Sequence, residues 1–389
     1  MAKQSPLRSR LIVVAALGTS QTLAWASSYY LPAILAVPIS TTLGVSSSWV
    51  FAAFSASLLV AAAAGPSVGR MIDRHGGRGM LVLSNAVLAA GLVTLAGASG
   101  PVSLFCAWAI VGIGMALGLY DAAFATLTAL YGTSARGPII GITLIAGFAS
   151  TLSWPLSSVL NDAVGWRDTC LVWAALNLLL SLPINHFLVP LPLRSGYRPH
   201  TITTRVGWQP RREMVLVAFA FAAAWFVTGS MGAHLPRLLE LAGASPTAAI
   251  TSAALVGPAQ VAARLVEFAI LRHLQPLVSA RLAAALYPVG VAALALLGPA
   301  GAAAFAALYG AGNGLLTIAR GTVPLALFGS RAYGERTGLI GAPGRAAQAL
   351  APITFGLLLD EVGLGSLVLS AGLCLAAFTA LLCLRARPP

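Results

Sequence analysis

Two residues of opposite charge, Asp121 and Arg320, stand inside long apolar stretches of the sequence. A charged side chain within a membrane-spanning helix costs several kcal/mol unless it is paired or hydrated, so such residues point to a functional site. A carboxylate loses its charge when it takes up a proton. A guanidinium offers a planar fork of N–H donors that fits a carboxylate or another oxyanion. The two residue types therefore predict proton binding and anion binding.

A polar and aromatic stripe follows the first apolar stretch of the chain. Gln21, Trp25, Ser28 and Tyr29 have the spacing i, i+4, i+7 and i+8, which places them on one face of a helix. Such a face would be costly against lipid, so we expect it to point into the protein or a cavity. Tyr29 and its neighbour Tyr30 also fit an aromatic belt near the membrane surface.

Two further residues extend this pattern into the second half of the chain. Trp225 follows Trp25 by 200 residues, and Asn313 adds a polar amide to the apolar stretch that carries Arg320. A cavity built from these groups would be small and aromatic, with few charges. It would suit a small organic anion or a small polar solute better than a large peptide or a lipid.

The composition indicates which elements position these residues. Of the 389 residues, 58% are hydrophobic and only 8% are charged, whereas a soluble domain has about a quarter charged residues. A soluble protein is therefore excluded. No phosphate loop, HExxH sequence or nucleophile elbow is present, so we expect no enzyme activity, no cofactor and no metal. The four cysteines lie in apolar segments without CxxC spacing, and we interpret them as buried thiols.

About twelve apolar stretches are long enough to cross a membrane as helices. The sequence thus predicts an all-α integral membrane protein. Its longest polar interval, residues 191–212, divides the chain into two six-helix bundles, 1–190 and 213–389. The expected spans lie near residues 11–36, 48–68, 79–98, 102–130, 137–160, 168–189, 213–236, 246–270, 280–298, 301–328, 337–359 and 364–384.

The basic residues give the expected orientation. The formal charge is +13, and with the N-terminus in the cytoplasm 18 of the 23 Lys and Arg residues fall in cytoplasmic segments. Cytoplasmic loops of membrane proteins carry this excess. We therefore expect both termini to be cytoplasmic and the bilayer to be an inner membrane, and we need no nucleic-acid partner to explain the charge.

The two halves resemble each other. Gly112-Ile113-Gly114 recurs as Gly310-Ala311-Gly312 after 198 residues, and the Asp162–Gly165 sequence has a counterpart after the same interval. Similar offsets in corresponding spans predict two parallel repeats, an arrangement found in many secondary transporters. Asp121 and Arg320, 199 residues apart, then occupy near-equivalent positions.

The segment from Gly69 to Arg78, GRMIDRHGGR, resembles the loop signature of the major facilitator superfamily, roughly G-x-L-x-D-R-x-G-R-R. The resemblance implies a rocker-switch transporter, here a bacterial one, with its substrate site between the halves. In that family the first, fourth, seventh and tenth spans line the central cavity, so Asp121 and Arg320 are expected to face each other. A latch that never touches substrate is the alternative.

Some family signatures are altered in this sequence. Trp108 stands four residues before Gly112, where many members have an arginine, and Ser153-Trp154-Pro155-Leu156 replaces the glycine-proline signature of the fifth span. Both departures count against a general multidrug exporter.

A second set of residues is expected to act as a gate. Around the signature, a charge network could form in one conformation and break in another, and the alternative is that its arginines only fix topology. Arg264 and Glu267 are interpreted as the second-half copy of this network, and Arg345 is expected to pair with Asp73. The predicted gating residues are Gly69, Arg70, Asp73, Arg74, Gly76, Arg78, Arg264, Glu267 and Arg345.

The sequence therefore favours a monomeric, proton-coupled secondary transporter for a small, monocarboxylate-like anion. Its expected partners are the substrate, a proton or counter-solute, and the lipid bilayer. The alternative is an efflux carrier for a toxic small solute, such as an arsenical or a drug-like compound. A receptor built on the same scaffold is a third possibility, from another functional class.

Overall fold

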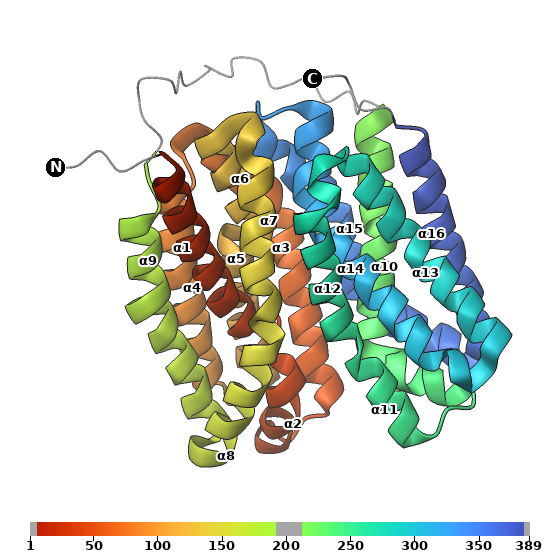
Figure 1. Ribbon diagram of the computed structural model, residues 1–389. Coiled ribbons are helices and arrows are strands. Elements are labelled where there is room, and N and C mark those ends of the chain that lie inside the picture. Colours follow the sequence, from red (N-terminus) through yellow and green to blue (C-terminus); the bar gives the residue numbers. More distant parts are fainter. Residues whose placement is uncertain (1–5, 192–211, 385–389) are drawn as a thin grey trace. The chain divides into compact units, whose positions relative to one another are not determined.

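The computed structural model describes residues 6–191 and 212–384, and every regular element in these two ranges is a helix (Figure 1). The chain forms two units. The N-terminal unit extends to Trp208 and includes Ser330–Gly338, and the C-terminal unit comprises Gln209–Gly329 and Leu339–Pro389. Of the expected central loop, 191–212, only the two end residues are among those described. The outermost residues of both termini also lie outside the described ranges.

The N-terminal unit contains the first half of the chain in a series of helices joined by short turns. A π-helical turn, Asn177–Ser181, precedes its last helix. The helices are α1 (Pro6–Ala26), α2 (Pro32–Leu43), α3 (Ser47–His75), α4 (Arg78–Ala96), α5 (Pro101–Gly118), α6 (Tyr120–Tyr131), α7 (Arg136–Ile145), α8 (Ala149–Leu176) and α9 (Leu182–Leu188).

The C-terminal unit contains the second half. Its helices are α10 (Arg212–Leu241), α11 (Pro246–Ala254), α12 (Val256–Ala269), α13 (Pro276–Leu297), α14 (Ala302–Phe328), α15 (Tyr333–Val362) and α16 (Ser366–Leu382). The first residues of α15 belong to the N-terminal unit, and the helix continues into the C-terminal unit at Leu339.

Several expected spans run together or break where the sequence alone does not indicate it. In the described residues, seven helical stretches are long and apolar enough to cross a membrane, and one of them, Pro101–Leu188, runs through three of the expected spans. The fourth span is broken at Leu119, which has extended backbone (φ −76°, ψ −172°) between α5 and α6. The fifth and sixth spans are separated inside α8 at Gly165, which lies between the two spans expected from the sequence and whose φ of 82° is open to glycine without strain.

The internal repeat is visible in the packing of equivalent glycines. A Cβ added to Gly112 would lie 2.5 Å from the carbonyl oxygen of Ser57 in α3, and one added to Gly310 would lie 2.6 Å from that of Val256 in α12. The glycines two residues later pack on α4 and α13. The fourth and tenth spans therefore approach their own neighbours in the same way in each unit.

The expectation of four buried thiols is wrong for two of them. Cys170 and Cys374 are buried, but Cys106 and Cys383 are exposed. An apolar segment that spans a membrane has one face towards protein and another towards lipid. Hydrophobicity of the segment alone therefore does not place a cysteine in the protein interior.

Candidate functional site

Arg320 lies on α14 with its guanidinium over the ring of Trp225 from α10, and the guanidinium carbon is 3.8 Å from the ring centroid. The attraction between a cation and an aromatic face is worth roughly 2 kcal/mol or more when both are shielded from water. Trp225 is itself 5% exposed, and α15 packs against its indole ring at Gly344. A Cβ added to Gly344 would lie 2.3 Å from the indole atom Cε3. The indole is therefore a fixed support for the guanidinium.

Asp121 lies in the first turn of α6, directly after the break at Leu119. The N-terminus of a helix carries a partial positive charge, which favours an acidic residue in the first turn. Asp121 is partly exposed, as is Arg320. The two residues belong to different units, so the expectation that they face each other stays a prediction.

Gln21 and Trp25 of α1 contact the broken fourth span. The side-chain Nε2 of Gln21 donates a hydrogen bond to the carbonyl oxygen of Gly118, 2.5 Å away, at the last residue of α5. The ring centroids of Trp25 and Tyr120 are 4.9 Å apart, and Tyr29 packs against Trp25 at 5.2 Å. Ser28 and Tyr29 lie in the turn that follows α1, so the expectation that all four residues share one face of a helix is wrong for these two. The stripe residues nevertheless contact protein in the N-terminal unit.

Two polar atoms of this stripe have no hydrogen-bond partner among the described residues. They are Oε1 of Gln21 and Nε1 of Trp25, an acceptor and a donor one helical turn apart. The Gly118 carbonyl oxygen can only accept a hydrogen bond, so the NH₂ end of the Gln21 amide must face it and Oε1 must point away. The atoms are suited to a ligand that carries both a donor and an acceptor.

The aromatic cluster extends further than the sequence indicated. Phe54 on α3 packs against both Tyr29 and Trp108, and Tyr120 stacks on Phe124 with centroids 5.3 Å apart. Trp108, at the position where family members often have an arginine, is 1% exposed. Only the spacing along α1 was readable in the sequence, because the other rings come from separate helices.

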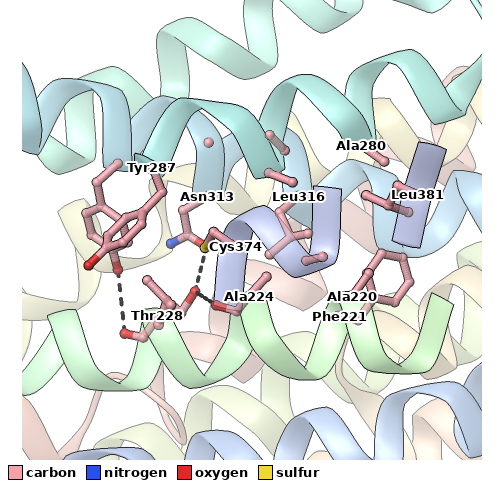
Figure 2. A pocket seen from close by; sticks show the side chains of 16 residues that line it. Ala220, Phe221, Ala224, Thr228, Ala280, Tyr287, Asn313, Leu316, Cys374 and Leu381 are labelled. Atoms are coloured by element: carbon pink, nitrogen blue, oxygen red, sulfur yellow. Dashed lines mark hydrogen bonds between the residues drawn. The ribbon is translucent and has the colours of Figure 1, made fainter. Parts of the chain in front are cut away.

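Asn313 on α14 borders a small cavity in the C-terminal unit (Figure 2). The Thr228 hydroxyl, which belongs to α10, lies 3.2 Å from Oδ1 of Asn313. The cavity has a volume of about 30 Å³, and a water molecule needs roughly 10–15 Å³ by the same kind of measure. The cavity can therefore hold water but is too small for an organic solute.

Asp73 caps the beginning of α15. Its carboxylate accepts hydrogen bonds from the backbone N–H groups of Gly334 and Glu335, at 2.9 and 2.8 Å. Arg70, one turn before Asp73 on α3, forms an ion pair of 3.3 Å with the Glu335 side chain. A carboxylate at a helix N-terminus is favoured both by these bonds and by the helix dipole.

Four glycines allow α3 and the first turns of α15 to approach backbone to backbone. A Cβ added to Gly69 would lie 2.0 Å from the carbonyl oxygen of Gly334, and one added to Gly338 would lie 2.7 Å from that of Gly65. Each helix therefore contributes a pair of glycines four residues apart, a pattern that permits close helix contact in membranes.

The rest of the signature forms the turn between α3 and α4. Gly76 has a φ of 82°, a backbone conformation that residues other than glycine rarely adopt. Arg74 is exposed, whereas Arg78 begins α4 and is half-buried. Most of the expected loop is thus helical, with only the turn at Gly76 and Gly77 between the helices.

The second-half counterpart is buried in the C-terminal unit. Glu267 on α12 is 0% exposed and accepts a hydrogen bond of 2.5 Å from the Ser279 hydroxyl on α13. Arg264 and Arg345 are also buried, at 6% and 8%. In the described ranges, no group of three or more His, Cys, Asp or Glu side chains is placed to hold a metal ion.

Comparisons with known proteins identify a family and find similar solved structures. The sequence model of the Major Facilitator Superfamily matches residues 17–317, and no curated protein matches the chain in sequence. The crystal structure of the human organic anion transporter MFSD10 (TETRAN) is similar with a TM-score of 0.72 and 16% identity, covering 97% of this chain and all of that one. The proton:xylose symporter XylE, bound to 6-bromo-6-deoxy-D-glucose, has a TM-score of 0.70 and 13% identity, covering 95% and 94%.

Proposed function

Because this chain belongs to the Major Facilitator Superfamily, we propose that it is a secondary active transporter that carries a small, monocarboxylate-like organic anion across the inner membrane. Transport proceeds by rocker-switch alternating access and is coupled to protons. Both termini are cytoplasmic in this proposal, in agreement with the distribution of basic residues along the sequence.

The observation that carries the proposal is the guanidinium of Arg320 resting on Trp225. Stacking uses the face of the guanidinium, and the N–H donors of an arginine lie in its plane, where a carboxylate can accept two parallel hydrogen bonds. A supported arginine also loses less freedom when it binds an anion, which increases affinity. In this proposal Arg320 binds the carboxylate of the substrate.

Neighbouring residues support a small substrate. Asn313 and Thr228 lie on the same two helices as Arg320 and Trp225 and form a neutral polar pair. On α1, Gln21 and Trp25 offer one acceptor and one donor beside aromatic rings. We assign Gln21, Trp25, Tyr29, Trp225 and Asn313 to the walls of the substrate site. One of the similar structures is of a protein named an organic anion transporter, which agrees with this choice of solute.

The direct test is a panel of small acids and neutral analogues applied to the purified protein. A ligand that binds only the folded state raises the apparent melting temperature. We expect a small monocarboxylate to raise it and the matching primary alcohol to have no effect. The acid that binds should also support counterflow in proteoliposomes. Stabilisation by uncharged toxicants alone would instead favour the efflux carrier.

Asp121 is the proposed proton-coupling group. We expect Asp121→Asn to abolish accumulation of the anion driven by a pH gradient and to retain counterflow, because the amide resembles the protonated carboxyl and cannot release a proton. The measurement is uptake into proteoliposomes with and without an imposed gradient. Asp162, an exposed acid in α8, provides the control as Asp162→Asn. Gradient-driven accumulation by the Asp121 variant would contradict the assignment.

The contact between the signature and α15 is the proposed gate. The Asp73 carboxylate accepts hydrogen bonds from two backbone amides of α15, and Arg70 forms an ion pair with the Glu335 side chain. All of these bonds break together if the start of α15 leaves α3, so the contact has two distinct states. Arg264, Glu267 and Arg345 are proposed to serve the C-terminal unit in a similar way, and Arg74 and Arg78 to complete the charge network.

A further inference from the structure

Three asparagines form a buried hydrogen-bonded chain inside the N-terminal unit. They are Asn85 on α4, Asn177 on the π-helical turn and Asn185 on α9, and none is more than 1% exposed. Nδ2 of Asn185 donates to Oδ1 of Asn85 at 2.8 Å, and Nδ2 of Asn85 donates to Oδ1 of Asn177 at 3.3 Å. We call these three residues the asparagine network. The π-helical turn and α9 each pack against α1 and against α4 in this region, and α1, α4 and α9 are labelled in Figure 1.

The direction of the network is fixed at one end by a backbone carbonyl. Nδ2 of Asn177 lies 2.9 Å from the carbonyl oxygen of Trp173, which can only accept a hydrogen bond. The amide nitrogen of Asn177 must therefore face that carbonyl, and its oxygen must face Asn85. The same reasoning sets the orientation of Asn85 and then of Asn185, so no amide in the network can be turned over without placing two acceptors against each other.

The other end of the network has acceptors without donors. Nδ2 of Asn185 donates to both Asn85 and the Ser20 hydroxyl, at 2.8 Å each. Oδ1 of Asn185 has no hydrogen-bond partner among the described residues, and the same holds for the hydroxyl of Ser181, which is 0% exposed. Ser181 precedes Asn185 by four residues, so the two side chains lie on one face of the helix.

We propose that this end of the network is a binding site for one internal water molecule, held between Oδ1 of Asn185 and the hydroxyl of Ser181. Buried waters usually make about three hydrogen bonds to polar groups that would otherwise be unsatisfied. A buried acceptor without a partner is costly in a membrane protein, where bulk water cannot reach it. One water donates a hydrogen bond to Oδ1 of Asn185 and either donates one to the Ser181 hydroxyl or accepts one from it.

The neutral character of the site favours water over a metal ion. Its two residues, Ser181 and Asn185, carry no charge, and the side chains linked to Asn185 through hydrogen bonds, those of Ser20, Asn85 and Asn177, are also neutral. An alkali cation taken from water into this region would lack a carboxylate to offset its desolvation, which costs several kcal/mol for an isolated ion. A water molecule has no such cost.

The water site has a consequence for α1. Ser20 of α1 and Ser27, the residue directly after α1, accept hydrogen bonds from Asn185 and Asn177, at 2.8 and 2.9 Å. These bonds fix the rotation of α1 about its axis, and the same helix carries Gln21 and Trp25 on the neighbouring stripe. The water therefore helps to position two residues assigned above to the substrate site. The water site itself stands on the hydrogen bonds alone and does not depend on the proposed substrate.

The sign of one stability change tests the proposal. If water bridges Ser181 and Asn185, Ser181→Ala removes one of its partners and should lower the melting temperature of the purified protein by roughly 2–4 °C. If the hydroxyl has no partner at all, its removal should raise the melting temperature or leave it unchanged, since an unsatisfied buried group is lost. A rise or no change would therefore overturn the proposal.

Ser230→Ala is the matched control. Ser230 is also 0% exposed, and its hydroxyl donates to the Phe226 carbonyl of its own helix at 2.9 Å. The Ser230→Ala variant also loses a buried hydroxyl oxygen, but no water is proposed to bind there. We therefore expect a smaller decrease in melting temperature than for Ser181→Ala. The melting temperature should also be the same in sodium and choline chloride. Stabilisation of the native protein by sodium that Ser181→Ala abolishes would mean that the site binds a cation, and the water proposal would be wrong.

Discussion

Arg320→Ala is expected to lower the transport efficiency for the cognate anion by about 30-fold or more. Truncating one partner of a desolvated, hydrogen-bonded charge pair typically costs about 2–5 kcal/mol, and each 1.4 kcal/mol corresponds to about tenfold. The measurement is the initial rate of counterflow in proteoliposomes over a range of anion concentrations. Arg320→Lys should retain part of the activity, since it keeps the charge but loses the planar fork.

Arg272→Ala is the control for the loss of an arginine that packs on a ring. Arg272 belongs to the same unit and lies 4.9 Å from the centroid of Phe268, but it is exposed. Its removal should leave counterflow close to the native rate. If Arg320→Ala moved the anion at the native rate as well, Arg320 would have no part in binding the substrate.

Gly69→Val is expected to have the second largest effect, through the gate. The added Cβ would lie 2.0 Å from the Gly334 carbonyl oxygen, and backbone cannot move aside as a flexible side chain can. Overpacking of this kind costs about 1–3 kcal/mol, so the close contact of α3 with α15 should be lost or weakened. We expect transport to fall by about tenfold, because the conformation that uses this contact becomes less populated.

The loss of the contact can be followed directly. A cysteine introduced by Ala332→Cys, next to the start of α15, should react faster with a thiol reagent in the Gly69→Val background. Gly79→Val is the matched control, because a Cβ at Gly79 has no neighbour within 4 Å. Equal labelling and equal transport in both glycine variants would show that the close packing has no role in the cycle.

Much of the architecture was predictable because it follows from length and hydrophobicity. The apolar stretches had to become helices, and the recurring glycines at 112 and 310 indicated an internal repeat, since both patterns are properties of the sequence itself. The close packing at these glycines is a finding of the structure. The break inside the fourth span was not predictable. No proline lies at Leu119, yet the chain departs from helical backbone there.

The site was predictable in residue type more than in contacts. The sequence singled out Asp73 as part of a charge network, but two of its partners are backbone amides, about 260 residues further along the chain. It singled out Trp225 and Arg320 separately and did not indicate that one supports the other. The asparagine network was missed because Asn85, Asn177 and Asn185 have no shared spacing, and only the packing of three helices brings them together.

The continuity of α15 limits how the two units can move. This helix has 30 residues and contains Pro343, which has no N–H to give to the carbonyl of Leu339, one turn earlier. Leu339 is also the residue at which the chain passes into the C-terminal unit. The helical ladder is thus interrupted where the units join, and bending between them is easiest there. Gly334 and Glu335 lie before this point, in the same unit as Asp73, so bending at Leu339 leaves their hydrogen bonds to Asp73 in place. Exchange of their amide hydrogens with solvent would therefore separate release of the start of α15 from bending of the helix.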